Sequence, residues 1–184
     1  MRGLWMVAAV AWLAGAIPAG GQQVTVSHAG GVWAIRGQKN SVDLDERDLA
    51  VTIHAGAAVW KMVPSGSQDM LVSAGGDRFW VRLADAGSIR IAPYETGFKT
   101  GVRLILDRFR GTGQAAPDRP LDLRVVLTMC LEGAGEELVS EAMVNEGAAL
   151  VKELHWPMAI DGRDVDYTVL SNDNGTLLPI QWSV

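Results

Sequence analysis

The run LDLRVVLTMCL, residues 121–131, decides the fold class of this chain. Every odd-numbered residue in it is apolar, from Leu121 through Leu127 to Leu131. Successive side chains of a β-strand point to opposite faces, so this period of two predicts one core-facing side and one wetter side. We therefore expect a central strand of an antiparallel sheet here.

The same alternation recurs in residues 49–53, 79–83, 102–106 and 165–170. Turn-forming residues separate these segments, and residues 111–120, with two Gly and two Pro, predict an exposed loop. Short strands without helices between them predict an all-β fold, an antiparallel β-sandwich or a barrel. About 160 residues suffice for one such domain, which we place at residues 22–184.

Residues 136–154 allow two interpretations. Their Glu, Ala, Leu and Lys content and the spacing of Leu138, Ala142, Leu150 and Leu154 favour a helix. Gly147 interrupts that pattern near its middle, and Gly costs about 1 kcal/mol in a helix interior. We predict two strands joined by a turn, with the helix as the alternative.

The first 21 residues have the features of a secretory signal peptide. Arg2 is followed by an apolar run of about ten residues, shorter than the ~20 of a membrane-spanning helix, and then by small residues. We predict cleavage before Gln22 and export to the periplasm or the extracellular space, with no transmembrane span in the mature chain. An uncleaved membrane anchor is the alternative.

Composition argues against several partners and cofactors. After residue 21 the chain keeps 15 basic and 21 acidic residues without a basic run, so we expect no nucleic-acid partner. The single cysteine, Cys130, cannot form an internal disulfide and is predicted to be a buried small hydrophobe. Residues 111–116 match a dinucleotide fingerprint formally, but Pro117 and Pro120 oppose the helix that it requires, so we predict no cofactor.

Metal and nucleophile signatures are weak. His28, His54 and His155 are far apart and have no Cys or His at ligand spacing, which argues against zinc. Asp161, Asp164 and Asp166 offer carboxylates to calcium, but their order matches no known loop, and a solvated turn is the simpler interpretation. No serine has the elbow sequence of a hydrolase nucleophile. We assign no catalytic and no metal-binding residue.

Aromatic residues supply the candidate carbohydrate contacts. Five tryptophans follow the leader, at positions 33, 60, 80, 156 and 182, and core packing is the ordinary role of each. Trp156 stands out because it follows His155 and precedes Pro157 and an acidic loop, where aromatic and polar groups can converge. We predict Trp60, His155 and Trp156 as carbohydrate contacts.

The order of elements from about residue 42 onward resembles a known module. The residues that carry the likeness are 59–61, 94–102, 154–157, 166–170 and 175–179, with the sequences VWK, YETGFKTGV, LHWP, DYTVL and GTLLP. They resemble the N-terminal galactose-mutarotase-like β-sandwich of large secreted glycoside hydrolases, closest to the endo-α-N-acetylgalactosaminidase type. These are strand and turn patterns and not catalytic signatures.

This resemblance implies an accessory, non-catalytic sandwich that packs against a downstream catalytic barrel and takes part in carbohydrate processing. Such modules are longer than this chain, so we expect an incomplete sandwich at the front of a larger protein, with an unpaired edge that invites self-association. The alternative is a self-standing exported β-sandwich that binds glycan or protein. A small exported enzyme is a third reading, without any paired-acid signature to support it.

Overall fold

The computed structural model describes residues 24–111, 116–170 and 176–179, so the leader and Trp182 lie outside the described residues. Fourteen strands and two short 3₁₀ helices form these parts. Their bounds are β1 (Thr25–Ala29), β2 (Val32–Arg36), β3 (Asn40–Asp45), β4 (Val51–Ala55), β5 (Ala58–Lys61), β6 (Met70–Ala74), β7 (Asp77–Val81), η1 (Leu83–Asp85), β8 (Ser88–Glu95), β9 (Lys99–Asp107), β10 (Leu123–Glu132), β11 (Glu137–Glu146), β12 (Leu150–Leu154), η2 (Gly162–Asp164), β13 (Tyr167–Leu170) and β14 (Thr176–Pro179).

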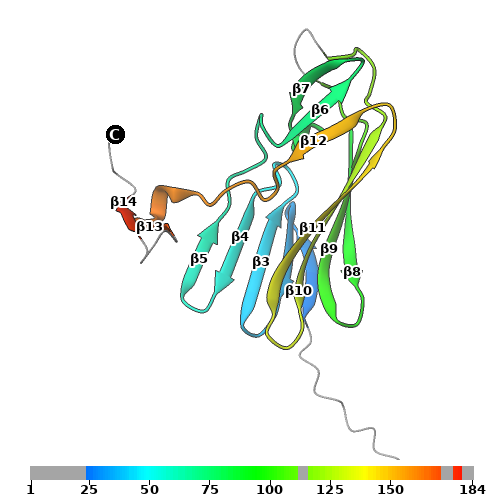
Figure 1. Ribbon diagram of the computed structural model, residues 1–184. Coiled ribbons are helices and arrows are strands. Elements are labelled where there is room, and N and C mark those ends of the chain that lie inside the picture. The colour runs from blue at the N-terminus through cyan, green and yellow to red at the C-terminus, as the bar shows by residue number, and fades with distance from the viewer. Residues whose placement is uncertain (1–23, 112–115, 171–175, 180–184) are drawn as a thin grey trace, which may run out of the picture.

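Two antiparallel sheets form the main sandwich (Figure 1). One sheet has five strands in the order β1-β2-β3-β4-β5, and the other has four in the order β11-β10-β9-β8. Strands β12, β6 and β7 form a third sheet at one end, and β13 and β14 pair only with each other beside the sandwich. The predicted all-β sandwich is confirmed.

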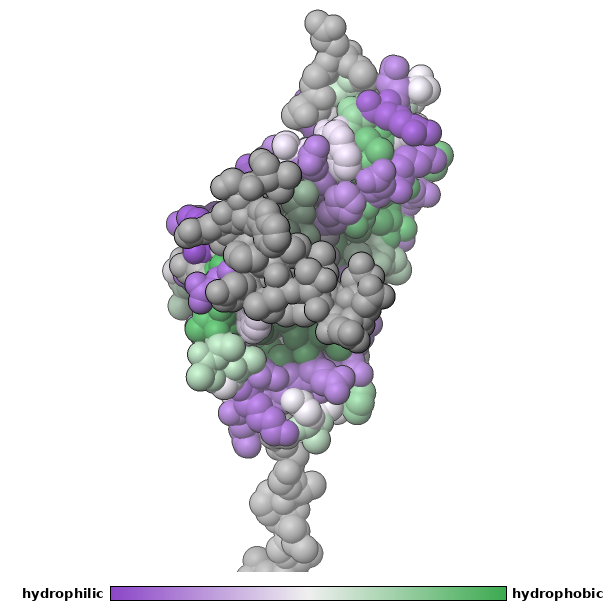
Figure 2. Space-filling model, turned by 60° about the vertical axis from the view of Figure 1, so that its left-hand side comes forward, coloured by the Kyte–Doolittle hydropathy of each residue, from purple (hydrophilic) through white to green (hydrophobic). Residues whose placement is uncertain are grey.

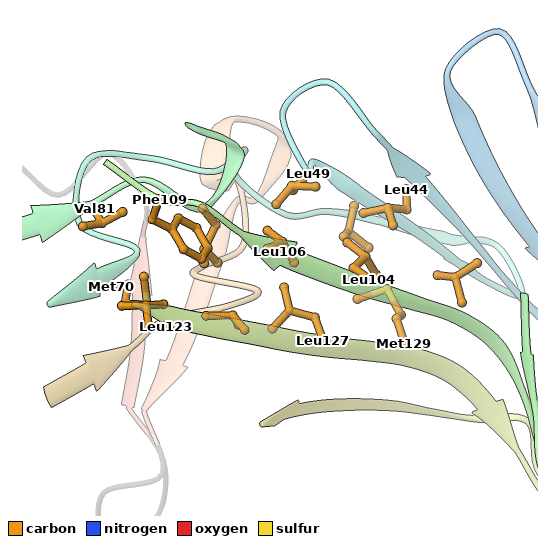
Figure 3. Close-up of a cluster of buried hydrophobic side chains, with 14 of the residues drawn as sticks. Leu44, Leu49, Met70, Val81, Leu104, Leu106, Phe109, Leu123, Leu127 and Met129 are labelled. Carbon is orange, nitrogen blue, oxygen red and sulfur yellow. The ribbon is translucent and has the colours of Figure 1, made fainter. Parts of the chain in front are cut away.

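A single hydrophobic core fills the space between the sheets. Leu104 and Leu127 from the four-stranded sheet face Leu44 from the five-stranded sheet, and all three are fully buried (Figure 3). Met70 and Phe109 extend the same core beneath the third sheet. Each buried Leu contributes about 1.5–3 kcal/mol relative to its exposed state, so this interior is the main source of stability.

The deciding run at residues 121–131 forms β10 and the turn before it, with β9 and β11 on its two sides. All six odd-numbered side chains are buried, as the alternation predicts. The even-numbered side chains of β10 are not all exposed to solvent, however. Arg124 is exposed, whereas Val126, Thr128 and Cys130 are buried. Neighbouring side chains on the outer face, among them the paired Lys99 and Glu141, cover this half of the strand.

The ambiguous segment 136–154 forms two strands, as predicted, and no helix. β11 pairs along its whole length with β10, while β12 leaves the sandwich and pairs with β6. Gly147 lies in the connection, where its backbone N–H bonds the carbonyl of Asp122 at 3.0 Å. Cross-strand pairing therefore outweighs the helix propensity of this segment.

The remaining segments follow the prediction with shifted ends. The predicted strand 49–53 begins at Val51, because Leu49 has a positive φ of 59° and belongs to the turn before it. Residue 83 of the predicted strand 79–83 lies in η1, although Leu83 is buried with Phe79 and Val81. The described parts of the predicted loop 111–120 contain no strand, and residues 112–115 lie outside the described residues.

Glu136 joins the two sheets at one end of the sandwich. Its carboxylate accepts backbone N–H bonds from Gln38 and Lys39 at 2.7 Å and from Asn40 at 2.8 Å, all in the β2–β3 turn. Burial raises the pKa of this fully buried carboxyl, but the three backbone hydrogen bonds lower it further, so the pKa lies below its ordinary value. Glu136 is therefore a charged clasp between the β2–β3 and β10–β11 turns.

Within the described residues, no helix has both the length and the apolar character needed to cross a membrane.

Candidate functional site

Trp60 lies on β5, at one edge of the five-stranded sheet. Cross-strand register places it in one row with Ile35, Val42 and Ile53, and this row faces the interior of the sandwich. Exposure rises along the row: Ile35 and Val42 are fully buried, Ile53 is half-buried, and Trp60 is 43% exposed. Trp60 therefore points inward but lacks cover from the opposite sheet.

The opposite sheet ends too early to cover it. Its edge strand is β11, whose inward-facing Ala142 and Val144 pair with the buried Leu127 and Val125. Ala142 is exposed. In Figure 1, β4 and β5 lie to the left of β10 and β11. We call the β5 edge of the sandwich, with Trp60 and the neighbouring Ile160, the open side.

Apolar groups continue around the open side. Ile160 forms an isolated antiparallel bridge with Met62, next to β5, and is 49% exposed. Backbone bonds from Val63 to Ala159 at 2.8 Å and from Asp161 to Lys61 at 2.6 Å hold this segment against the sheet edge. Figure 2, which brings this part of the molecule forward, shows hydrophobic residues interspersed with hydrophilic ones around the atoms drawn in grey.

His155 and Trp156 lie at a different place, where the chain leaves β12. The backbone N–H of His155 bonds the carbonyl of Asp69 at 2.7 Å, and its Nδ1 lies 3.1 Å from the carbonyl oxygen of Gln68. Its ring also contacts Trp80 of β7, with 5.9 Å between ring centroids. Trp156 is half-buried and packs against the core. His155 and Trp156 are therefore held against the third sheet and the core by these contacts.

The three predicted carbohydrate contacts differ in their surroundings and in their exposure. Within the part of the chain that the structure describes, Trp60 makes no ring contact with His155 or Trp156. Trp60, which is 43% exposed, and His155, whose side chain is 42% exposed, both present accessible rings, whereas Trp156 is half-buried. The assignment of Trp60, His155 and Trp156 as carbohydrate contacts therefore stays a prediction.

In the acidic loop at residues 161–166, the first carboxylate forms hydrogen bonds within the loop itself. Asp161 caps η2 and binds Arg163 through both of its oxygens, with Arg163 Nε at 2.9 Å from each. The hydrogen bonds from Arg163 lower the pKa of Asp161 to about 2. No group of three or more His, Cys, Asp or Glu side chains able to hold a metal occurs among the described residues.

Each histidine is instead adjacent to one carboxylate. His28 lies 3.0 Å from Glu46, His54 lies 3.5 Å from Asp43, and His155 lies 3.5 Å from Glu153. His28 is on β1, His54 is on β4, and His155 follows β12. Cys130 is fully buried, and burial raises the pKa of its thiol to about 11, so the predicted inert thiol agrees with its surroundings.

No protein-family model matches this chain, and neither the curated proteins nor the solved structures provide a match.

Proposed function

We propose that this chain is a non-catalytic β-sandwich module of an exported carbohydrate-processing protein. In this role it packs through its open side against a further folded domain, which is the catalytic domain and lies downstream in the same protein. The proposal carries forward the likeness of residues 59–61, 94–102, 154–157, 166–170 and 175–179 to glycosidase sandwiches. Export rests on the features of residues 1–21.

The incomplete burial of Trp60 is the observation that carries the proposal. An inward-facing Trp on a five-stranded sheet is expected to be covered by the opposite sheet, yet Trp60 is 43% exposed and Ile160 is 49% exposed. Contiguous apolar groups rimmed by polar residues mark protein interaction sites. Large aromatic side chains also dominate the binding energy of protein interfaces, so Trp60 is the natural anchor.

The described carboxyl groups with shifted pKa values have structural partners. The carboxyl groups with shifted pKa values are Asp45, Glu136 and Asp161, and all three are lowered. Lowered values follow from their hydrogen bonds to arginine side chains or backbone N–H groups, which are structural contacts. A glycosidase needs a general acid whose pKa is raised and a second carboxylate about 5 Å or more away.

The coding sequence after the codon for Val184 gives the first test. An open frame that encodes a barrel supports the proposal, while unrelated sequence in its place contradicts it. The second test incubates the purified chain with chromogenic glycosides of neutral and N-acetylated sugars. Release of chromophore above a boiled control would show catalysis and refute the accessory role.

The open side is tested by separate expression of the downstream domain. The two purified parts are expected to co-elute on size exclusion, and Trp60→Ala is expected to weaken their association at least about tenfold, the usual scale of a Trp hot spot. Val59→Ala is the matched control, because Val59 is 53% exposed on the outer face of the same strand. Equal effects of both substitutions would exclude the open side as the docking surface.

A further inference from the structure

A groove lies on the other side of the sandwich, between the edge strands β1 and β8. It measures about 650 Å³ and is lined by His28 and Trp33 from the first sheet and by Ile89 and Ile91 from the second. β1 and β5 are the two edges of one sheet, so this groove and the open side are at opposite sides of the molecule (Figure 1). The groove is wide and open to solvent, so a ligand would lie against its wall and keep part of its surface in water.

Two stacked rings form one wall of the groove. His28 and Trp33 are cross-strand partners in the β1–β2 register, and their ring centroids are 4.5 Å apart with an interplanar angle of 13°. Trp33 is half-buried against the core, whereas the side chain of His28 is 39% exposed. Both rings line the groove, and His28 has the larger exposed fraction. Ile89 and Ile91 face it from β8 as apolar, half-buried residues.

Hydrogen-bonding groups lie beside the stacked rings. Glu46 Oε2 is 3.0 Å from His28 Nε2, and both side chains are 39% exposed, so each retains capacity for a further partner. The backbone N–H of Glu46 bonds the carbonyl of Gly31 at 2.9 Å, which holds the backbone of Glu46 next to the β1–β2 turn. The indole N–H of Trp33 is buried and has no acceptor among the described residues.

The charges around the groove favour a neutral ligand. Arg47 Nε donates to Asp45 Oδ1 at 2.9 Å, and a second nitrogen bonds the other oxygen, so its charge is already compensated. Arg90 donates to Asp107 and to Ser88, each at 3.0 Å. An anion would therefore meet the carboxylate of Glu46, whereas both arginines already have acidic or hydroxyl partners. A ligand with hydroxyl groups meets donors and acceptors that it can match.

We infer that the groove between β1 and β8 binds one neutral pyranose ring of a glycan. A pyranose has an apolar face of C–H groups, which matches the stacked His28 and the Ile89 and Ile91 wall, and hydroxyl groups at its edge, which match Glu46 and His28. Apolar contact with a few fixed polar groups is the general composition of a small-ligand site. This site is separate from the proposed docking surface and does not depend on it.

The test measures binding of the purified protein to a panel of neutral mono- and disaccharides of glucose, galactose, mannose and their N-acetyl derivatives, by calorimetry and intrinsic fluorescence. At least one member is expected to bind saturably. His28→Ala and Glu46→Gln are each expected to weaken that binding about tenfold or more, as expected for loss of stacking or of one hydrogen bond to a charged group. Trp33→Phe is expected to remove the ligand-induced fluorescence change while circular dichroism stays unchanged.

His54→Ala is the matched control, because His54 forms a similar histidine–carboxylate pair with Asp43 on the outer face of the same sheet, with 43% of its side chain exposed. It is expected to change the affinity less than about twofold, the usual scale of a remote surface substitution. Absence of binding to every sugar in the panel would overturn the inference. The inference would also be overturned if His28→Ala and Glu46→Gln left binding intact, or if His54→Ala weakened it equally. Preferential binding of the cation tetramethylammonium over every sugar would overturn it as well.

Discussion

The centre of the sandwich and its open side follow the same sequence pattern but end in different environments. Leu127 on β10 and Trp60 on β5 both face inward by strand alternation, yet Leu127 is fully buried and Trp60 is 43% exposed. Leu127 has a strand on each side and a sheet opposite, whereas Trp60 lies at an edge without that cover. Alternation determines the face of a side chain, and the opposing sheet determines whether that face is covered.

The largest expected effect tests the covered centre. Leu127→Ala leaves a cavity in a core of fully buried neighbours and is expected to lower the free energy of unfolding by about 3–5 kcal/mol. Urea denaturation measures this loss. Ala142→Ser, at the register partner of Leu127 on β11, is the control and is expected to change stability by less than about 0.5 kcal/mol because Ala142 is exposed. A loss below about 1 kcal/mol for Leu127→Ala would contradict the assigned core.

The second prediction concerns the clasp that closes one end of the sandwich. Glu136→Gln removes the charge that accepts three backbone N–H bonds and replaces one acceptor oxygen by a donor. We expect a loss of about 2–3 kcal/mol, the cost of unmet buried hydrogen bonds. Glu137→Gln, at the exposed neighbouring residue, is the control and is expected to be neutral. Equal stability of both variants would rule out the clasp.

We also expect the lowered pKa of Glu136 to make the stability of the protein depend on pH. The pKa of Glu136 is lowered from 4.5 in the folded chain, so its contribution is fully present above 4.5 and is lost as the pH falls through the folded pKa. Asp45 and Asp161, with pKa values of about 2, add small losses between 3.8 and 2. Glu136→Gln is therefore expected to flatten the acid limb of a denaturation series, and an unchanged limb would contradict this assignment.

Cys130 shows the reverse of Trp60: its side chain points outward by strand alternation, yet it is buried. It lies on the outer face of β10 and is nevertheless fully buried, and burial raises its thiol pKa to about 11. A pKa two units above the usual 9.0 leaves about a hundredfold less thiolate at neutral pH. We expect Ellman's reagent to label the native protein at least that much more slowly than the protein in urea, and fast native labelling would show that the outer face is open.

The smallest expected effect belongs to the open side. Trp60→Ala removes a side chain that is 43% exposed, so we expect a stability loss below about 1 kcal/mol and a reduced tendency of the isolated chain to self-associate at high concentration. Denaturation and analytical ultracentrifugation measure the two effects. A loss of 3 kcal/mol or more, the scale of a buried aromatic, would mean that the residue belongs to the core.

The fold class was accessible from sequence because strand alternation is local. Residues 121–131 place Leu123, Val125 and Leu127 on one face before any partner strand is known, and the structure buries all three. The break at Gly147 likewise marked the end of β11. Helix propensity was the weaker guide for residues 136–154, because ladder bonds to β10 and β6 outweigh it.

The candidate site was much harder to predict from the sequence than the fold class. The sequence neighbours of Trp156 single it out as a sugar contact, and the structure places both Trp156 and Trp33 half-buried against the core. Trp33 also lines a groove, together with Ile89 and Ile91 from a strand more than fifty residues away. The only sequence signal for this site is the pairing of His28 with Trp33 across the Gly30-Gly31 turn, which a hairpin prediction would have placed side by side.

The sequence by itself determined which side chains of each strand face inward, that Cys130 has no disulfide partner within the chain, and that residues 136–154 break at Gly147. Only the tertiary structure decided that Glu136 clasps the β2–β3 turn, that Cys130 is covered on the outer face, and that Trp60 is left without cover. The physical reason is that a strand's faces follow from its own backbone geometry. Burial depends instead on which distant strand packs opposite, and no local pattern encodes that choice.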